Sequence, residues 1–260
     1  MSEAMDAEFD TVAEWTAEAA RELGEEYFLP AACRGSGSPA ALDWLIGALE
    51  LSTGDVLLDS GAGVGGPAYY AVQNRRVHPL LAEPEAGACR ASARLFSLPV
   101  VQASGSALPI ADHAVDAAWS LGVLCTMDDQ LGLLTELSRV VRPPGRIGLI
   151  VYVATEQIPD EEQPEGNRFP TMASLDELFH TARLTVVEQR LAAELDATPS
   201  DWQQRVDDVE AEIARRHGQH KAWKLAEKQS ERMGDLIGDG AVQATLFSVR
   251  HSPADPSRPG

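Results

Sequence analysis

One stretch, DVLLDSGAGVGGPAYY at positions 55–70, restricts the folds open to this chain more than any other part of it. An apolar run ends at Asp59, and a loop with glycine at positions 61, 63, 65 and 66 follows before Pro67 begins a helical pattern. Glycine lacks a Cβ atom, so such a loop can take positive φ angles and let a ligand lie against the backbone, while the following helix offers free N–H groups. The stretch therefore predicts a strand, a glycine turn and a helix that bind a nucleotide-like cofactor.

Two other interpretations of the same letters stay open at this point. Gly61, Gly63 and Gly66 have the G-x-G-x-x-G spacing of dinucleotide-binding loops. A glycine turn with a purely structural role fits them as well. The surrounding chain has to decide between these interpretations.

Strand and helix patterns alternate after the loop up to residue 153, which predicts a mainly parallel sheet. The apolar run at 146–153 is typical of a strand buried on both faces. Residues 155–171 are polar and contain prolines, so we predict a mobile loop there. Pro30 is predicted to interrupt the N-terminal helices. The further predicted strands span 77–82, 99–103, 114–119, 184–191 and 241–251, and the predicted helices span 6–23, 40–49, 85–96, 128–141, 199–218 and 219–237, with one more beginning at 174.

Charge and cysteine content exclude several classes of function. The chain has 40 acidic and 21 basic residues and a net charge of −19, which repels nucleic acid and anionic membrane surfaces. Cys33, Cys89 and Cys125 form no C-x-x-C pair, so neither a disulfide framework nor a metal site is expected. No window approaches the apolar length of a membrane span, and the N-terminus lacks the pattern of a signal peptide. We therefore expect a soluble cytoplasmic protein.

The order of these motifs resembles the class I S-adenosylmethionine-dependent methyltransferases, in particular their small-molecule branch with the pattern LDxGxGxG … DA-x-x-LP. The matching residues are Leu58–Gly65, Glu83, Ser104–Pro109 and Val115–Leu121, within roughly residues 34–153. This resemblance implies an α/β fold with a Rossmann-like, doubly wound, mainly parallel seven-stranded sheet whose last strand is antiparallel. The cofactor-binding core would span 51–192 and 241–251, preceded by N-terminal lid helices at 1–50. The two helix patterns inserted before the last strand predict a helical cap at 193–240, and the proline-rich polar composition of 252–260 predicts a disordered tail.

The same resemblance implies a set of cofactor contacts. Asp59 organises the glycine loop near the cofactor's positive amino group or sulfonium, and Glu83 accepts hydrogen bonds from the ribose hydroxyls, since a carboxylate has two acceptor oxygens. Arg34 could reach the cofactor carboxylate, although a surface role fits it equally. The full predicted set is Arg34, Asp59, Ser60, Gly61, Ala62, Gly63, Gly65, Glu83, Pro84, Ser104, Gly105, Ser106, Ser120 and Leu121.

The chain departs from the family pattern at two places. Ser104 stands where the family commonly has an aspartate that accepts from the adenine amino group, and a serine accepts without charge. Cys125 and Thr126 stand where several relatives place a histidine, so no catalytic base can be carried over. His217 and His220 are the candidate bases, with solvated helix-end histidines as the alternative. Candidate walls of the acceptor pocket are Tyr27, Trp202 and Trp223, which could equally be packing residues.

We expect methyl transfer from S-adenosylmethionine to a small-molecule acceptor, with O-methylation as the first expectation, S-adenosylhomocysteine as product and a homodimer as the oligomeric form. A protein that binds either cofactor form without transferring a methyl group is the first alternative. An NAD(P)-dependent oxidoreductase is the second. Two helices before the glycine strand and an isolated closing strand favour the methyltransferase over the oxidoreductase.

Overall fold

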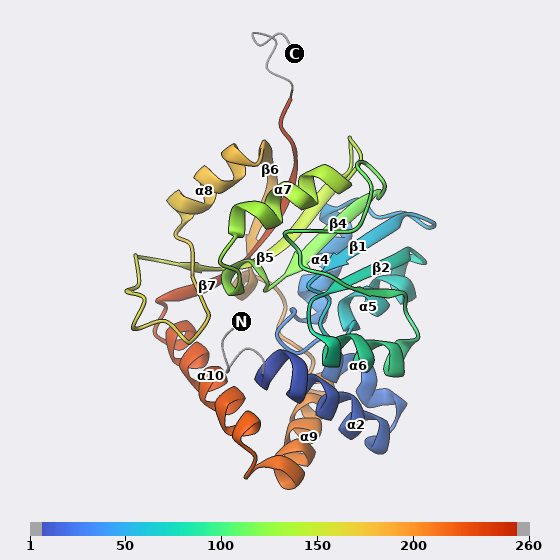
Figure 1. Cartoon of the computed structure of the whole chain (residues 1–260), viewed down its shortest axis with the longest axis vertical. Helices are drawn as coiled ribbons and strands as arrows, with labels where there is room; N and C mark the ends of the chain where they lie inside the picture. Colours follow the sequence, from blue (N-terminus) through green and yellow to red (C-terminus); the bar gives the residue numbers. More distant parts are fainter. Residues whose placement is uncertain (1–6, 254–260) are drawn as a thin grey trace.

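A computed structural model describes residues 7–253 as a seven-stranded sheet with helices on its faces and at one edge (Figure 1). The strand order across the sheet is β3-β2-β1-β4-β5-β7-β6. The strands are β1 (Val56–Ser60), β2 (His78–Glu83), β3 (Val100–Gln102), β4 (Ala117–Leu121), β5 (Arg146–Ala154), β6 (Leu184–Leu191) and β7 (Val242–His251). Most of the predicted C-terminal tail, residues 254–260, lies outside the described residues.

Strand directions confirm the predicted doubly wound sheet. β1 pairs in parallel with β2 and β4, and the parallel pairing continues to β3 on one side and to β5 on the other. β7, the last strand, runs antiparallel to both β5 and β6. The chain leaves β1 toward β2 on one side and reaches β4 on the other, so the strand order reverses at β1. The carboxyl ends of β1, β2 and β4 therefore meet at the edge where sheets of this kind bind ligands.

The helices follow the predicted pattern closely. Ser38 begins α4 as predicted, since its Oγ accepts a hydrogen bond from the Ala41 N–H at 3.2 Å and Pro39 takes the first helical position. The helical elements are η1 (Ala7–Val12), α2 (Ala13–Leu23), η2 (Glu25–Tyr27), α3 (Phe28–Ala32), α4 (Pro39–Ala48), α5 (Gly66–Arg75), α6 (Ala86–Phe96), η3 (Leu124–Thr126), α7 (Gln130–Val140), α8 (Met172–Thr181), η4 (Ala192–Glu194), α9 (Ser200–His217) and α10 (Lys221–Gly238). None of the described helices is long and apolar enough to cross a lipid bilayer.

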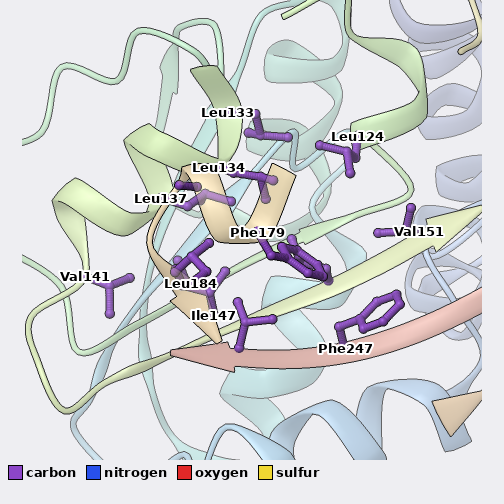
Figure 2. Packing of buried hydrophobic residues seen from close by; sticks show 14 of the residues in the cluster. Leu124, Leu133, Leu134, Leu137, Val141, Ile147, Val151, Phe179, Leu184 and Phe247 are labelled. Carbon is purple, nitrogen blue, oxygen red and sulfur yellow. The ribbon is translucent and has the colours of Figure 1, made fainter. Parts of the chain in front are cut away.

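Apolar side chains are buried on both faces of the sheet. On one face, Leu133, Leu134 and Leu137 of α7 pack with Phe179 of α8 and Phe247 of β7 (Figure 2). The three leucines are fully buried because positions i, i+1 and i+4 lie on one side of a helix. Residues of α4 and α5 form a second cluster on the other face, together with the fully buried side chain of Trp119. Burial on both faces is what the continuous apolar run of β5 predicts.

Two helical parts cover the edge near the glycine loop. The first, here called the N-terminal helices, comprises residues 7–32. The second, the α9–α10 hairpin, comprises residues 200–238 and is inserted between β6 and β7. The two parts contact each other along α2 and α9, and in Figure 1 they lie together at the lower end of the molecule.

Two local predictions differ from the structure. Pro30 does not interrupt the chain but lies inside the short helix α3, where the first turn needs no N–H donor. Residues 155–171 are held by the side chains of two buried glutamines. Gln163 donates to the Ile158 carbonyl at 3.0 Å and accepts from the Phe169 N–H at 2.8 Å. Gln229 of α10 donates to the Glu165 carbonyl at 2.7 Å and accepts from its N–H at 3.2 Å.

Candidate functional site

The glycine loop connects β1 to α5 as predicted. Gly61, Gly63 and Gly65 all have positive φ, which residues with a side chain rarely adopt. At Gly63 φ is 52°, and a Cβ atom built there would meet no atom within 4 Å. The backbone at this point faces open space, so a ligand can approach it closely.

Asp59 lies at the carboxyl end of β1 and is 1% exposed. Burial raises the pKa of its carboxyl group to about 7, against the lowering effects of the Trp119 indole and the Ala68 backbone N–H at the start of α5. Trp119 is close enough to lower this pKa, yet its indole N–H lies outside hydrogen-bonding geometry, and one Asp59 oxygen is buried without a partner. A buried carboxyl oxygen without a partner is costly unless a donor or a cation reaches it.

Glu83 occupies the equivalent place at the end of β2 and is 5% exposed. Its Oε2 accepts the Gly63 N–H at 2.7 Å and its Oε1 accepts the Glu85 N–H at 3.0 Å, so it fastens the end of β2 to the glycine loop. Burial outweighs these two bonds and raises the pKa of Glu83 to about 7. Each carboxylate oxygen retains a free lone pair. The observed bonds of Glu83 are therefore compatible with the predicted contact to ribose hydroxyls, which remains a prediction.

The remaining predicted cofactor residues lie along the same edge. Ser104 is exposed, and its Oγ lies 3.1 Å from that of Ser106. Gly105 is buried against the side chains of Ser60 and Leu133. The Ser120 hydroxyl donates to the Ser60 carbonyl at 2.8 Å, which joins β4 to β1 beneath the loop. The others are Ala62 and Leu121, both buried, and Pro84, whose carbonyl accepts from Gln102 at 2.9 Å.

Arg34 has a carboxylate partner within the protein. Its Nε lies 2.5 Å from Oε1 of Glu210 on α9. The ion pair links the loop after α3 to the α9–α10 hairpin. A contact with a cofactor carboxylate remains a prediction for this residue.

The two candidate bases lie in the turn between α9 and α10, at the end of the hairpin away from the sheet in Figure 1. His217 stacks on the ring of Trp15 with centroids 4.0 Å apart, and His220 meets the edge of the same ring at 5.1 Å. His220 also accepts the Ala222 N–H through Nδ1 at 3.2 Å, which caps α10. These contacts give both histidines a packing role.

Of the three candidate acceptor-pocket aromatics, Tyr27 and Trp223 pack in one cluster, and Trp202 packs in another. Trp223 is buried with Val209 and Ile213 between the hairpin and the N-terminal helices, and the Tyr27 hydroxyl lies 3.5 Å from Asp208. Trp202 instead packs on the α4–α5 face of the sheet, edge to face with Tyr70. A small cavity between the two helical parts is lined by Val12, Thr16, Ala31, Arg34, Val206, Val209, Glu210, Ile213 and Trp223.

Several contacts near the candidate site are not predicted by the sequence patterns. Asp10 accepts the Gly87 N–H at the start of α6, and Trp119 lies against Asp59 from β4. Both pairs are far apart in sequence, so no local pattern indicates them. The acidic spacing of Asp10, Glu14 and Glu18 was the available signal, because it places three carboxylates on one side of a helix.

Comparison with known proteins decides the fold family. A family model described as a methyltransferase domain matches residues 58–149, which run from the end of β1 into β5. Residues 58–149 of the chain are a methyltransferase domain. The match spans the glycine loop, Glu83 and the Ser104–Ser106 turn, so the predicted cofactor edge lies inside the methyltransferase domain.

Two curated relatives of the chain agree with that assignment. The chain is 34% identical over 114 residues to the 27-O-demethylrifamycin SV methyltransferase of Amycolatopsis mediterranei, covering 41% of this chain and 42% of the relative. It is 25% identical over 154 residues to methyltransferase GfsG of Streptomyces halstedii, covering 56% and 55%. The chain thus spans about half the length of these curated relatives.

Two solved structures share the fold of this chain. The cyclase SpnF aligns with a TM-score of 0.64 at 21% identity, covering 81% of this chain and 80% of that one. A sarcosine dimethylglycine methyltransferase described for Galdieria sulphuraria aligns with a TM-score of 0.64 at 17% identity, covering 81% and 84%. The shared fold extends well beyond residues 58–149.

Proposed function

We propose that this protein transfers a methyl group from S-adenosylmethionine to a small-molecule acceptor. The observation that carries the proposal is the pair of buried carboxyl groups, Asp59 and Glu83, at the ends of adjacent parallel strands beside the glycine loop. Within residues 7–253 neither carboxyl group forms an ion pair with a basic side chain. A site of this charge stabilises a cationic ligand, and S-adenosylmethionine carries a sulfonium and an ammonium group.

The same charge disfavours the dinucleotide alternative. A nicotinamide dinucleotide brings an anionic pyrophosphate to the glycine loop, where Asp59 would repel it. Arg34, a cation predicted to reach the ligand, is paired with Glu210. The charge therefore favours binding of S-adenosylmethionine, with or without methyl transfer, over an oxidoreductase.

The residues at this edge fit the proposed cofactor. Asp59 offers an oxygen that has no partner, Gly63 offers open backbone, and Glu83 offers free lone pairs for two hydroxyls. Ser104 and Ser106 would receive the adenine, with hydroxyl groups in place of a carboxylate. When bound, the cofactor supplies an electrophilic methyl group, and the protein aligns the acceptor and excludes water.

We assign no catalytic base to the transfer. Burial raises the pKa of the Cys125 thiol to about 12, so it does not act as a thiolate base near neutral pH. The Thr126 hydroxyl donates to the Val123 carbonyl at 2.8 Å, and both candidate histidines pack on Trp15. The acceptor is proposed to be one whose nucleophile reacts through alignment alone, with its proton released to bulk water.

We propose O-methylation of a metabolite in the cytoplasm as the specific reaction. The name of the 27-O-demethylrifamycin SV relative supports an oxygen acceptor. The predicted division into lid helices, core and cap is proposed as well, with the α9–α10 hairpin and residues 155–171 walling the acceptor side. Contacts between Gln229 and Glu165 support a wall built from these two parts.

A second candidate is cofactor binding without methyl transfer. The printed name of SpnF is that of a cyclase, so this fold also serves a reaction other than methyl transfer. Ser104 and the absence of an assigned base, among residues 7–253, favour the same alternative.

Calorimetry with S-adenosylmethionine and S-adenosylhomocysteine tests the cofactor assignment. We expect saturable binding of both, with about a tenfold loss of S-adenosylmethionine affinity in Asp59→Asn, the size expected for one charge-assisted contact. Asp55→Asn, at the opposite end of β1, is the matched control and should bind normally. No saturable binding of either compound rejects the assignment. Incubation with methyl-labelled cofactor and a panel of hydroxyl and amine acceptors then separates transfer from binding alone.

A further inference from the structure

The N-terminal helices are fastened to the cofactor side of the sheet. Asp10 accepts the Gly87 N–H, Glu14 pairs with Arg90, and Glu18 lies 3.7 Å from Arg94, all on α6. At the glycine loop, the α3 backbone lies so close that a Cβ atom on Gly66 would approach the Ala32 carbonyl carbon to 2.5 Å. A ligand on the glycine loop therefore lies next to these helices.

The other side of the N-terminal helices supports the α9–α10 hairpin. Trp15 of α2 holds the hairpin turn, with His217 stacked parallel to its ring at an interplanar angle of 2° and His220 edge-on at 88°. Glu22 pairs with Arg216, and apolar side chains of both parts are buried together around Trp223. The hairpin turn thus rests on a helix that also contacts the cofactor side.

The hairpin reaches the acceptor side through its second helix. Gln229 and Arg232 of α10 bond the backbone of residues 162–165, and this segment continues to Phe169, which packs with Cys125 beyond β4. The α9–α10 hairpin also contacts the sheet side through Trp202 of α9, which packs against Tyr70. A shift at the hairpin turn would therefore move the wall proposed for the acceptor.

We propose that Trp15 is a positioning residue that relays cofactor occupancy from the N-terminal helices to the α9–α10 hairpin. The inference rests on the proposed function. A cofactor that binds the seated form of the N-terminal helices more tightly shifts the population toward that form, and the Trp15 contacts with His217 and His220 carry the shift to the hairpin. The acceptor wall then becomes ordered after the cofactor has bound.

Hydrogen–deuterium exchange with and without saturating S-adenosylhomocysteine tests the relay. In the wild-type protein, the ligand should slow exchange both in residues 13–32 and in residues 200–238. In Trp15→Leu, slowing should persist in 13–32 and fall at least twofold in 200–238, with ligand affinity changed less than threefold. Trp15→Phe keeps a ring to stack and should restore the response.

Two further variants keep the test decisive. Trp202→Leu is the control, because Trp202 belongs to the hairpin but packs on the sheet side, away from Trp15. In this variant the ligand should still slow exchange in residues 200–238. If Trp15→Leu does not fold, His217→Ala removes the ring that stacks on Trp15 and should weaken the same response. A full hairpin response in either relay variant overturns the inference while leaving the cofactor assignment intact. Failure of the wild-type protein to bind S-adenosylhomocysteine overturns both.

Discussion

Replacing Asp59 by asparagine should change how stability depends on pH, because the carboxyl group is buried without a cation. Folding raises its pKa from 3.8 to about 7, so between these values the folded state binds more protons than the unfolded state. The free energy of unfolding must then fall as pH rises through this window. The full effect of a shift of this size is about 4 kcal/mol, of which about 2 kcal/mol falls between pH 5.5 and 8.5.

Urea denaturation of the ligand-free protein, followed by tryptophan fluorescence across pH 5.5–8.5, measures this effect. The wild-type protein should lose about 2 kcal/mol more stability over this range than Asp59→Asn. Some slope should remain in the variant because burial also raises the pKa of Glu83. Asp55→Asn should keep the wild-type slope. Parallel pH profiles for wild type and Asp59→Asn would refute the claim that Asp59 is an uncompensated buried acid.

Three other outcomes are expected. S-adenosylmethionine affinity, measured by calorimetry, should weaken as pH falls below 7, because a cationic ligand requires the ionised form of Asp59 and Glu83; a pH-independent affinity would contradict this. Leu137→Ala should lower the free energy of unfolding by about 2–5 kcal/mol, since the side chain is fully buried, and a loss below 1 kcal/mol would show that the cluster is loosely packed. Arg139→Leu should destabilise the segment after the Ser104–Ser106 turn, because its guanidinium bonds the carbonyls of residues 108 and 110; faster amide exchange there than in wild type checks it.

Much of the fold could be predicted from the sequence because its signals are local. The glycine loop, the apolar run of β5 and the Ser38-Pro39 helix start each occupy a few consecutive residues, and each is found where predicted. The exception among local signals is Pro30, since a proline can interrupt a helix or fit its first turn, and the sequence does not say which.

The position of the candidate site's residues on the fold was predictable, and their contacts were less so. Asp59 and Glu83 end adjacent strands, so their proximity follows from sheet topology. The partners of Arg34, His217 and His220 come from elements far away in the chain, and no pattern in the sequence pairs Trp15 with the hairpin turn. The bonds that Gln163 and Gln229 form with residues 155–171 could not be predicted either, because a glutamine in a polar stretch is usually exposed.

A crystal structure of the protein with S-adenosylhomocysteine is the most direct test of the central claim. We predict the amino acid part of the ligand over Gly61–Gly65, within reach of Asp59, and the ribose hydroxyls within hydrogen-bonding distance of Glu83. A ligand bound away from the carboxyl ends of β1 and β2, or ribose hydroxyls without contact to Glu83, would contradict it.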